Sequence, residues 1–345
     1  MMIKLFTHID LDGVGCAVLA KLAFKDDVDI EYCDFNDNEI NKKVLDYINH
    51  DNKAFIYITD ISVNEEVAKL LDKRGNVQLL DHHPTALNLN KYNWCKVITG
   101  CLNVDGIKTS GTEMFYYWLG INGCLDDELE NNKLLKKFVE LVRDYDTWRW
   151  TEFGDEGILC KQINDLLYIY GKEKFISWCI SKIYYNNSLE LNDTDKLLLN
   201  IKQKEIDNYI EKKDKQLFIL PMCGYNAGFV FAEKYFSELG NKLCKKHPEV
   251  DFIVMIDMDG TISYRTIRED LDLGQKIAKQ FGGGGHPKAA GSQFSKEVLL
   301  KIVKYIFYEG WKHDLIGGGG VIVEKVIKYK CSDCGELFDS EERCL

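Results

Sequence analysis

The sequence predicts a two-domain α/β protein, in which a domain with a mainly parallel sheet is joined by a helical linker to a smaller α/β domain. In the first hundred residues, short apolar runs alternate with amphipathic segments, which is the pattern of βαβ units. Residues 190–214 then form a charged stretch whose apolar residues recur at helical spacing. The strand and helix pattern resumes after it, and 345 residues are enough for two domains.

The first part is expected to contain four strands, three intervening helices and a helical region. The expected strands are 3–6, 30–35, 54–59 and 77–80, and the expected helices are 13–24, 38–48 and 64–72. From Ser110 to about Tyr185 the pattern is helical. Ser110 or Thr112 is expected to cap the first of these helices, because a hydroxyl oxygen can accept a hydrogen bond from a free N–H group of the first turn.

The second part begins near Gln216. The expected strands are 217–223, 251–257 and 261–266, and the expected helices are 231–245, 273–281 and 296–308. We therefore expect a first domain at 1–189, a linker helix at 190–213, a second domain at 214–312, and a glycine hinge with a cysteine-containing tail at 313–345. The hinge is expected at the four-glycine run 317–320.

Composition and charge exclude some classes of function. No apolar run reaches the roughly 18 residues that a membrane helix needs, and charged residues interrupt the N-terminal apolar stretch, so a cytoplasmic protein with no membrane partner is expected. The net charge is −11, and residues 214–330 hold 17 Lys/Arg against 14 Asp/Glu. A protein that grips long nucleic acid normally has a broad basic face. A short or small phosphorylated substrate therefore fits better.

Three of the expected strands are followed by acidic and histidine residues, which are residue types that commonly bind metals. The first is followed by His8, Asp10 and Asp12, whose alternate spacing places them on one side of an extended segment. The third is followed by Asp60 and the fourth by Asp81-His82-His83. Helix capping is the alternative role for Asp12 and Asp60. Because sites form at the carboxyl ends of strands in open α/β sheets, the joint occurrence favours a centre for divalent cations such as Mn²⁺.

A further acidic ligand is expected in the segment 142–148. There an apolar helix leads into Asp144 and Asp146, and Asp144 is the favoured ligand. Solvated surface charges are the alternative. A carboxylate such as Asp60 can bridge two metal ions about 3.5–4 Å apart, so two cations are expected.

The four-glycine run 282–285 and the following His286 form the second strong motif. Glycines allow positive φ and close backbone approach, so the N–H groups of Gly283, Gly284 and Gly285 can surround a phosphate while His286 donates to it. Arg265, in the strand 261–266, offers a guanidinium to phosphate oxygens or to a base, with Arg268 as second choice. A flexible loop is the alternative for the glycine run.

Most of the twelve cysteines lie in apolar patterns and are expected to be buried core residues. Cys331, Cys334 and Cys344 instead resemble part of a zinc ribbon. A closed structural zinc site needs four ligands, so His313 or a cysteine of a second subunit would have to supply the fourth. The alternative is a disordered acidic tail.

Together these motifs resemble those of the DHH/DHHA1 phosphoesterases, a superfamily that includes RecJ-type exonucleases, nanoRNases and family II inorganic pyrophosphatases. The resemblance covers roughly residues 1–150 and 214–308 and leaves the cysteine tail outside. It rests on Asp60 and on the segments His8–Gly13, Asp81–His83, Ser110–Thr112, Asp144–Asp146 and Gly283–Gly291. The Asp-Tyr-Asp-Thr-Trp form departs from the more familiar fourth motif.

The resemblance implies a role for each site residue. His8 and Asp10 would bind one Mn²⁺, Asp12, His82 and the acid at Asp144 the other, and Asp60 would bridge them, with Mg²⁺ or Co²⁺ as alternatives. The expected catalytic side chains are Asp60, Asp81 and His83, and His83 would face the scissile phosphate. The glycine loop, His286 and Arg265 would hold the substrate from the second domain.

The implied activity is that of a Mn²⁺-dependent phosphodiesterase acting on short oligonucleotides or on cyclic or linear nucleotide second messengers. Two cations would generate hydroxide from a shared water. One alternative is a RecJ-like exonuclease specific for single strands, which needs a basic channel lined by aromatic residues. The other is a sponge or sensor that binds a nucleotide without cutting it. The sequence leaves open the exact substrate, RNA or DNA preference, cleavage polarity and whether the chain forms a homodimer.

Overall fold

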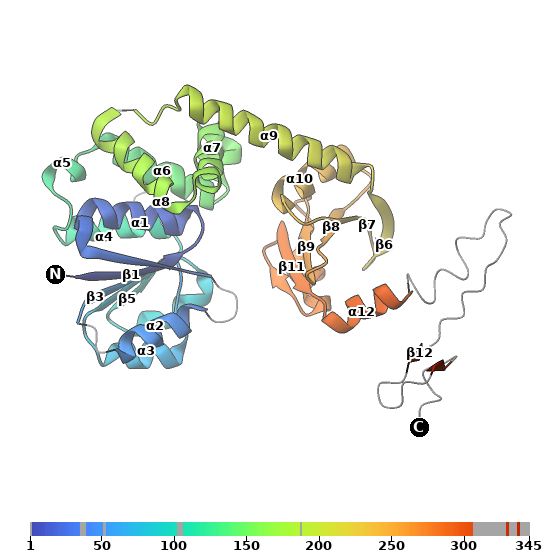
Figure 1. Cartoon of the computed structure of the whole chain (residues 1–345), viewed down its shortest axis with the longest axis horizontal. Helices are drawn as coiled ribbons and strands as arrows, with labels where there is room; N and C mark the ends of the chain where they lie inside the picture. The colour runs from blue at the N-terminus through green and yellow to red at the C-terminus, as the bar shows by residue number, and fades with distance from the viewer. Residues whose placement is uncertain are drawn as a thin grey trace. The chain divides into compact units, whose positions relative to one another are not determined.

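The computed structural model describes residues 2–34, 39–50, 53–101, 106–186 and 188–305, together with two short strands near the C-terminus (Figure 1). The chain divides into two compact units, residues 1–203 and residues 204–345. Within the described part, no helix combines the length and the apolarity that a membrane span requires. The cysteine trio expected to bind zinc, Cys331, Cys334 and Cys344, lies outside the described residues, as does His313.

A five-stranded sheet forms the centre of the first unit, with strand order β2-β1-β3-β4-β5 and every pair parallel. Its strands are β1 (Ile3–His8), β2 (Val28–Cys33), β3 (Phe55–Thr59), β4 (Val77–Asp81) and β5 (Cys95–Val97). This confirms the predicted fold class. Because β1, β3 and β4 are neighbours and run in the same direction, their carboxyl ends meet at one edge.

Helices cover both faces of this sheet (Figure 1). One face carries α1 (Leu11–Phe24) and α4 (Gly111–Ile121), and the other carries α2 (Glu39–Asn49) and α3 (Glu65–Asp72). The remaining helices of the unit are α5 (Asp127–Glu130), α6 (Lys133–Asp146), α7 (Gly154–Tyr170) and α8 (Lys172–Ser181), with the shorter turns η1 (Lys25–Asp27), η3 (Pro84–Lys91), η4 (Arg149–Glu152) and η5 (Lys182–Asn186).

The core of the first unit is divided by the sheet into two clusters. Leu5 packs on the α1 and α4 side, and its neighbour Phe6 packs on the α2 and α3 side. Alternate strand residues point to opposite faces, so a strand covered on both faces is apolar throughout. The cap expected for α4 is confirmed, because the Ser110 hydroxyl accepts a hydrogen bond from the N–H of Glu113 at 3.2 Å.

The long helix α9 (Asp193–Asp214) contains the division between the two units. It begins with a reciprocal cap, in which Asp195 N–H donates to Asn192 Oδ1 and Asn192 N–H donates to Asp195 Oδ2. Further along, Ile206 and Ile210 belong to a core cluster of the second unit.

The second unit contains a six-stranded sheet in the order β10-β11-β9-β8-β7-β6, in which only β7 and β8 pair in parallel. The strands are β6 (Phe218–Met222), β7 (Tyr225–Phe231), β8 (Phe252–Ile256), β9 (Thr261–Arg265), β10 (Gly284–Gly285) and β11 (Ala289–Gln293). The helical elements are α10 (Phe236–Lys246), α11 (Leu273–Lys276), η6 (Ala278–Phe281) and α12 (Lys296–Lys304). The strands β12 (Tyr329–Lys330) and β13 (Leu337–Phe338) pair separately.

Two expected helices of the second unit differ from the structure. The helix expected from 231 was wrong at its start, because 225–231 forms β7 and α10 begins only at Phe236. Gly228 lets β7 lie close to its neighbours, since a Cβ there would be 2.8 Å from Ile253 Cδ1. The helix expected at 273–281 is broken in two at Ile277, whose backbone (φ −115°, ψ −71°) departs from helical values.

Candidate active site

Acids and imidazoles gather at the edge where β1, β3 and β4 end. Three overlapping groups of side chains each bring their ligand atoms within 4.8 Å of one another. These groups are His8, Asp10 and Asp60; Asp12, His82 and Asp146; and Asp60, Asp81, His82 and His83. We use the name acid cluster for His8, Asp10, Asp12, Asp60, His82 and Asp146. Its members lie at the end of β1, just before and within α1, directly after β3 and β4, and at the end of α6, so the fold brings together residues that are far apart in the sequence.

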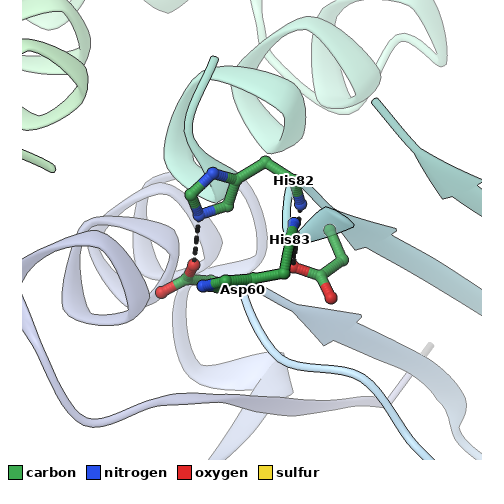
Figure 2. Close-up of side chains that lie close together, drawn as sticks. Asp60, His82 and His83 are labelled. Atoms are coloured by element: carbon green, nitrogen blue, oxygen red, sulfur yellow. Dashed lines mark hydrogen bonds and ion pairs between the residues drawn. The ribbon is translucent and has the colours of Figure 1, made fainter. Parts of the chain in front are cut away.

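Asp60 lies at the centre of the acid cluster. Its carboxylate is 1% exposed, with Oδ1 3.1 Å from His82 Nε2 (Figure 2) and Oδ2 3.8 Å from His8 Nδ1. Oδ2 is buried and has no hydrogen-bond partner among the described residues. Burial, and then repulsion from neighbouring carboxylates, raises the pKa of Asp60 well above its usual value. A cation between the carboxylates would remove this repulsion.

The N-terminus of α4 holds two of these acids in place. Asp12 accepts hydrogen bonds from the N–H groups of Gly111 at 2.6 Å and Thr112 at 2.8 Å, which have no partner within the helix. Gly111 also contacts Asp60, since a Cβ on this residue would lie 2.6 Å from Asp60 Cβ. The Ser110-Gly111-Thr112 motif therefore positions the acid cluster, a role that its sequence did not reveal.

Asp10 and His82 are in the ionisation states that suit metal binding. Asp10, and not Asp12, caps α1 by accepting from Gly13 N–H at 3.1 Å, and its other oxygen lies 3.0 Å from His8 Nδ1. Burial opposes ionisation of Asp10, but these hydrogen bonds outweigh it and lower its pKa. Burial also lowers the pKa of His82 and favours the neutral imidazole that can bind a metal.

The two acids at the end of α6 have opposite surroundings, and the geometry favours Asp146 over Asp144, the acid that the sequence favoured as a ligand. Asp146 Oδ2 lies 3.6 Å from His82 Nε2, within the acid cluster. Asp144 Oδ1 instead accepts from Arg143 at 3.0 Å and from Arg149 at 3.1 Å. Residues two apart on a helix point in nearly opposite directions, so only one of them can face the cluster.

Asp81 orients the ring of His83 through a hydrogen bond to Nδ1. Asp81 Oδ1 is 2.7 Å from His83 Nδ1 and accepts from the backbone N–H groups of His82 and His83, while Ser62 donates to Oδ2. Burial works against ionisation, but the pairing with His83 lowers the pKa of Asp81. In the same way the pKa of His83 is raised, because the Asp81 carboxylate outweighs the effect of burial. His83 is thereby suited to hold a proton near neutral pH.

The glycine loop of the second unit lies beside β11 and borders a cavity of about 360 Å³. Gly282 and Gly285 have φ of +72° and +137°, and a Cβ on Gly283 would lie 2.0 Å from Gly291 O, so the loop needs glycine. Gly284 pairs with Gly291, and His286 is exposed. Binding of substrate by Gly283, Gly284, Gly285 and His286 stays a prediction.

Arg265 lies in the neighbouring strand, but its guanidinium packs against α10. It donates to Tyr264 O at 2.9 Å and to Ser237 Oγ at 3.3 Å, and a Cβ on Gly240 would lie 2.5 Å from Arg265 Cγ. Its Nε is buried without a partner among the described residues, and burial lowers the pKa of the guanidinium. A role for Arg265 in substrate binding also stays a prediction. Arg268, the second choice, is paired with Asp251 and Asp270.

Comparison with known proteins identifies the family. No family model matches the chain. The chain is, however, 36% identical over 318 residues to oligoribonuclease NrnB of Bacillus subtilis, an alignment that covers 89% of this chain and 76% of the relative. The chain belongs to the DHH/DHHA1 family of phosphoesterases. It is therefore a metal-dependent phosphoesterase.

More distant relatives share this fold. This DHH protein is 22% identical to a 3′,5′-cyclic-nucleotide phosphodiesterase of Helicobacter pylori, over 85% of this chain and 93% of the relative. The structure of exonuclease RecJ bound to manganese superposes with a TM-score of 0.55 at 14% identity and covers 90% of this chain and 89% of RecJ. At that identity the likeness shows the two-domain fold alone.

Proposed function

We propose that this DHH protein is a Mn²⁺-dependent phosphodiesterase that hydrolyses short oligonucleotides. The observation that carries the proposal is the acid cluster, in which buried carboxylates face one another with no Lys or Arg paired to Asp10, Asp12, Asp60 or Asp146 among the described residues. The 36% identical relative is an oligoribonuclease, which favours an oligonucleotide as substrate.

The donor set fits two divalent cations. His8 and Asp10 would hold one, and Asp12, His82 and Asp146 would hold the other. Asp60, whose oxygens face His82 and His8 separately, would be shared between them. Carboxylate and imidazole donors suit Mn²⁺, and the buried Oδ2 of Asp60 is an acceptor in need of a partner. When bound, two such ions would polarise a phosphoryl oxygen and lower the pKa of a water.

His83 would supply a proton. Asp81 fixes its ring through Nδ1, which leaves Nε2 as the atom that would meet the phosphate oxygens. Because Asp81 raises the pKa of His83, the ring can stay protonated near neutral pH and can donate to charge that develops on the leaving oxygen. Asp81 would then act as a positioning residue for His83 and not as a ligand.

The second unit would bind the rest of the substrate. The N–H groups of the glycine loop at Gly283–Gly285 would donate hydrogen bonds to phosphate oxygens, and His286 would add a further donor. The near balance of charge in residues 214–330, with 17 Lys/Arg and 14 Asp/Glu, favours short substrates over long ones. A cyclic nucleotide is the second candidate substrate, and the Helicobacter pylori relative favours it.

The test is a substrate panel with chelator-treated protein, with and without Mn²⁺. The panel contains 5′-labelled RNA of two to twenty-four nucleotides, matched DNA, a linear and a cyclic dinucleotide, and cyclic mononucleotides. We expect Mn²⁺-dependent release of mononucleotides, fastest from the shortest RNA, and loss of all turnover in Asp60→Asn. Equal rates in wild type and Asp60→Asn, or binding without any product, would contradict the proposal. Product only from cyclic mononucleotides would favour the second candidate.

A further inference from the structure

A second cavity lies beside the acid cluster in the first unit, where β3 and β4 end and η3 begins. Its volume is about 320 Å³, and its walls include Asn41, Asn64, Asn88, Ser62 and Thr85. We call it the asparagine pocket. Neither the metal-binding motifs nor the glycine loop contributes to these five residues, so the proposed function leaves the pocket without a role.

The walls of the asparagine pocket suit an uncharged polar ligand. None of the residues that line it is Lys or Arg, and its two acids are already paired, Glu65 with Lys91 and Asp81 with His83, so the walls beyond His83 offer a phosphate no cationic side chain. Amide and hydroxyl side chains offer both donors and acceptors. The carboxylate of Glu65 adds an acceptor, because its buried Oε2 has no hydrogen-bond partner among the described residues. The edges of a nucleobase and the hydroxyls of a ribose have this same mixed character.

Part of the wall is held in place before any ligand binds. Asn64 Oδ1 accepts from Val67 N–H at 2.9 Å and thereby caps α3, and Asn41 Oδ1 accepts from Asn64 N–H at 2.8 Å. The other part is exposed and available, since Thr85 and Asn88 lie on η3 with no hydrogen bond from their side chains to another described residue. Fixed polar groups lose little entropy when a ligand binds.

The pocket is connected to the reaction centre through two shared residues. His83 and Asp81 line the pocket and also belong to a ligand group of the active site. A phosphate beside His83 would therefore have its attached nucleoside within reach of the pocket. A volume near 320 Å³ is at the lower end of the roughly 300–1,000 Å³ typical of small-molecule sites, which suits one nucleoside.

We propose that the asparagine pocket binds the nucleoside attached to the scissile phosphate, with Thr85 and Asn88 as specificity-determining residues. The inference rests on the proposed phosphodiesterase function and adds the part of the substrate that this site recognises. The enzyme then selects nucleotides over other phosphodiesters through neutral hydrogen bonds in the first unit, separately from phosphate binding.

The experiment compares two substrates that share a phosphodiester and differ in the nucleoside. One is the dinucleotide ApA, and the other is bis(p-nitrophenyl) phosphate. The variants are the double substitution Thr85→Val and Asn88→Leu, which removes the hydrogen bonds, and Asn88→Trp, which fills the pocket. Asn93→Leu and Asn93→Trp are the matched controls, because Asn93 is exposed just beyond η3 and does not line the pocket.

We expect kcat/KM for ApA to fall about tenfold in the double variant, as the loss of two hydrogen bonds predicts, and further in Asn88→Trp. Turnover of bis(p-nitrophenyl) phosphate should stay within about twofold of wild type, the typical scatter of a distant surface change, and the Asn93 controls should match wild type on both substrates. An unchanged kcat/KM for ApA overturns the proposed role of the pocket, while the proposed phosphodiesterase function stands. An equal loss on both substrates also overturns it, since the variants would then act through His83.

If the wild-type protein cleaves neither substrate with Mn²⁺, the proposed function fails. The proposed role of the pocket is then tested separately, by measuring nucleotide binding. Calorimetric titration with adenosine 5′-monophosphate in Mn²⁺ is the measurement. Binding by wild type and Asn93→Trp that is lost in Asn88→Trp supports the pocket. Absence of binding, or equal binding by all three proteins, overturns it.

Discussion

Two neighbouring regions of the first unit differ in what their acidic side chains contact. In the arginine network (Glu113, Arg143, Asp144 and Arg149), each carboxylate meets a guanidinium, with Arg143 2.7 Å from Glu113 and 3.0 Å from Asp144. In the acid cluster, the carboxylates of Asp60 and Asp146 face other carboxylates and imidazoles, and their pKa values are raised by burial and by that repulsion. The fold pairs the acids of the arginine network with guanidinium groups, whereas the acids of the proposed metal centre have no Lys or Arg partner among the described residues.

The largest expected effect on activity comes from replacing the two acids of α6, Asp144 and Asp146, one at a time. We expect Asp146→Asn to lower kcat on the order of 10²–10³-fold, as the loss of a charged group at a reaction centre does. Asp144→Asn, its matched control, should retain activity within about tenfold, because it weakens only a supporting contact. Initial rates with Mn²⁺ and a short RNA measure both. A larger loss of kcat in Asp144→Asn than in Asp146→Asn would mean that Asp144 is the metal ligand and Asp146 the supporting residue.

The second test concerns stability. Glu113 is 2% exposed, and Glu113→Gln leaves the partly buried Arg143 with Asp144 as its remaining carboxylate partner, so the free energy of unfolding should fall by about 2 kcal/mol. The exposed Glu140, 4.0 Å from Lys137, is the control, and Glu140→Gln should cost less than about 0.5 kcal/mol. Urea unfolding in the presence of a chelator measures both variants without a contribution from metal. Similar small losses would mean that the arginine network contributes little.

The third test uses two glycines of α4. Gly111→Ala places a Cβ 2.6 Å from Asp60 Cβ and should displace that carboxylate, at a cost of roughly 10–100-fold in Mn²⁺ affinity. Gly120 lies on the same helix, where a Cβ would be 3.8 Å from Glu130 Oε1, so Gly120→Ala should leave Mn²⁺ affinity unchanged. Calorimetric titration of both variants measures the difference. Equal affinities would show that Asp60 does not depend on the approach of α4.

The sequence predicted the sheet and the acid cluster well for a specific physical reason. The apolar runs that form β1, β3 and β4 are buried on both faces. Each is followed by charged or polar residues, which are costly to bury in an apolar core without a partner. Alternation of strands with helices implies parallel strands, so the sequence alone places His8, Asp60 and His82 at one edge of the sheet.

Features that depend on orientation were not predictable in the same way. Asp144 and Asp146 are chemically identical, and only the phase of α6 at its last turn decides which one meets His82. Similarly, the strand position of Arg265 was clear, but not that its side chain would pack against Gly240 of α10. The asparagine pocket is built from α2, the connection between β3 and α3, and η3, and its residues form no sequence motif. These outcomes depend on tertiary packing, which local patterns do not encode.

The smallest expected effect is at a partly exposed ion pair in the second unit, where solvent screening weakens the attraction between the two charges. His247 Nε2 lies 2.6 Å from Asp214 Oδ1, and this hydrogen bond raises the pKa of His247 from 6.5. A raised histidine pKa gives stability that is fully present below the unfolded value and lost as the pH rises through the folded one. We expect a loss of about 0.5 kcal/mol above pH 6.5.

Unfolding measured from pH 5.5 to 8.5 checks this expectation. His247→Gln and Asp214→Asn should each reduce the loss of stability, and the double variant should add nothing further. A pH dependence that persists in both single variants would assign it to other groups.

Binding of Mn²⁺ tests the central claim most directly. Chelator-treated wild-type protein, dialysed against Mn²⁺ and analysed for metal, should hold about two ions per chain, the number that the paired ligand groups provide. Asp60→Asn should hold fewer, while the control Asp144→Asn should hold the wild-type number. A wild-type protein that retains no Mn²⁺, or an Asp60→Asn protein that retains as much as wild type, would contradict the assignment of the acid cluster as a metal centre.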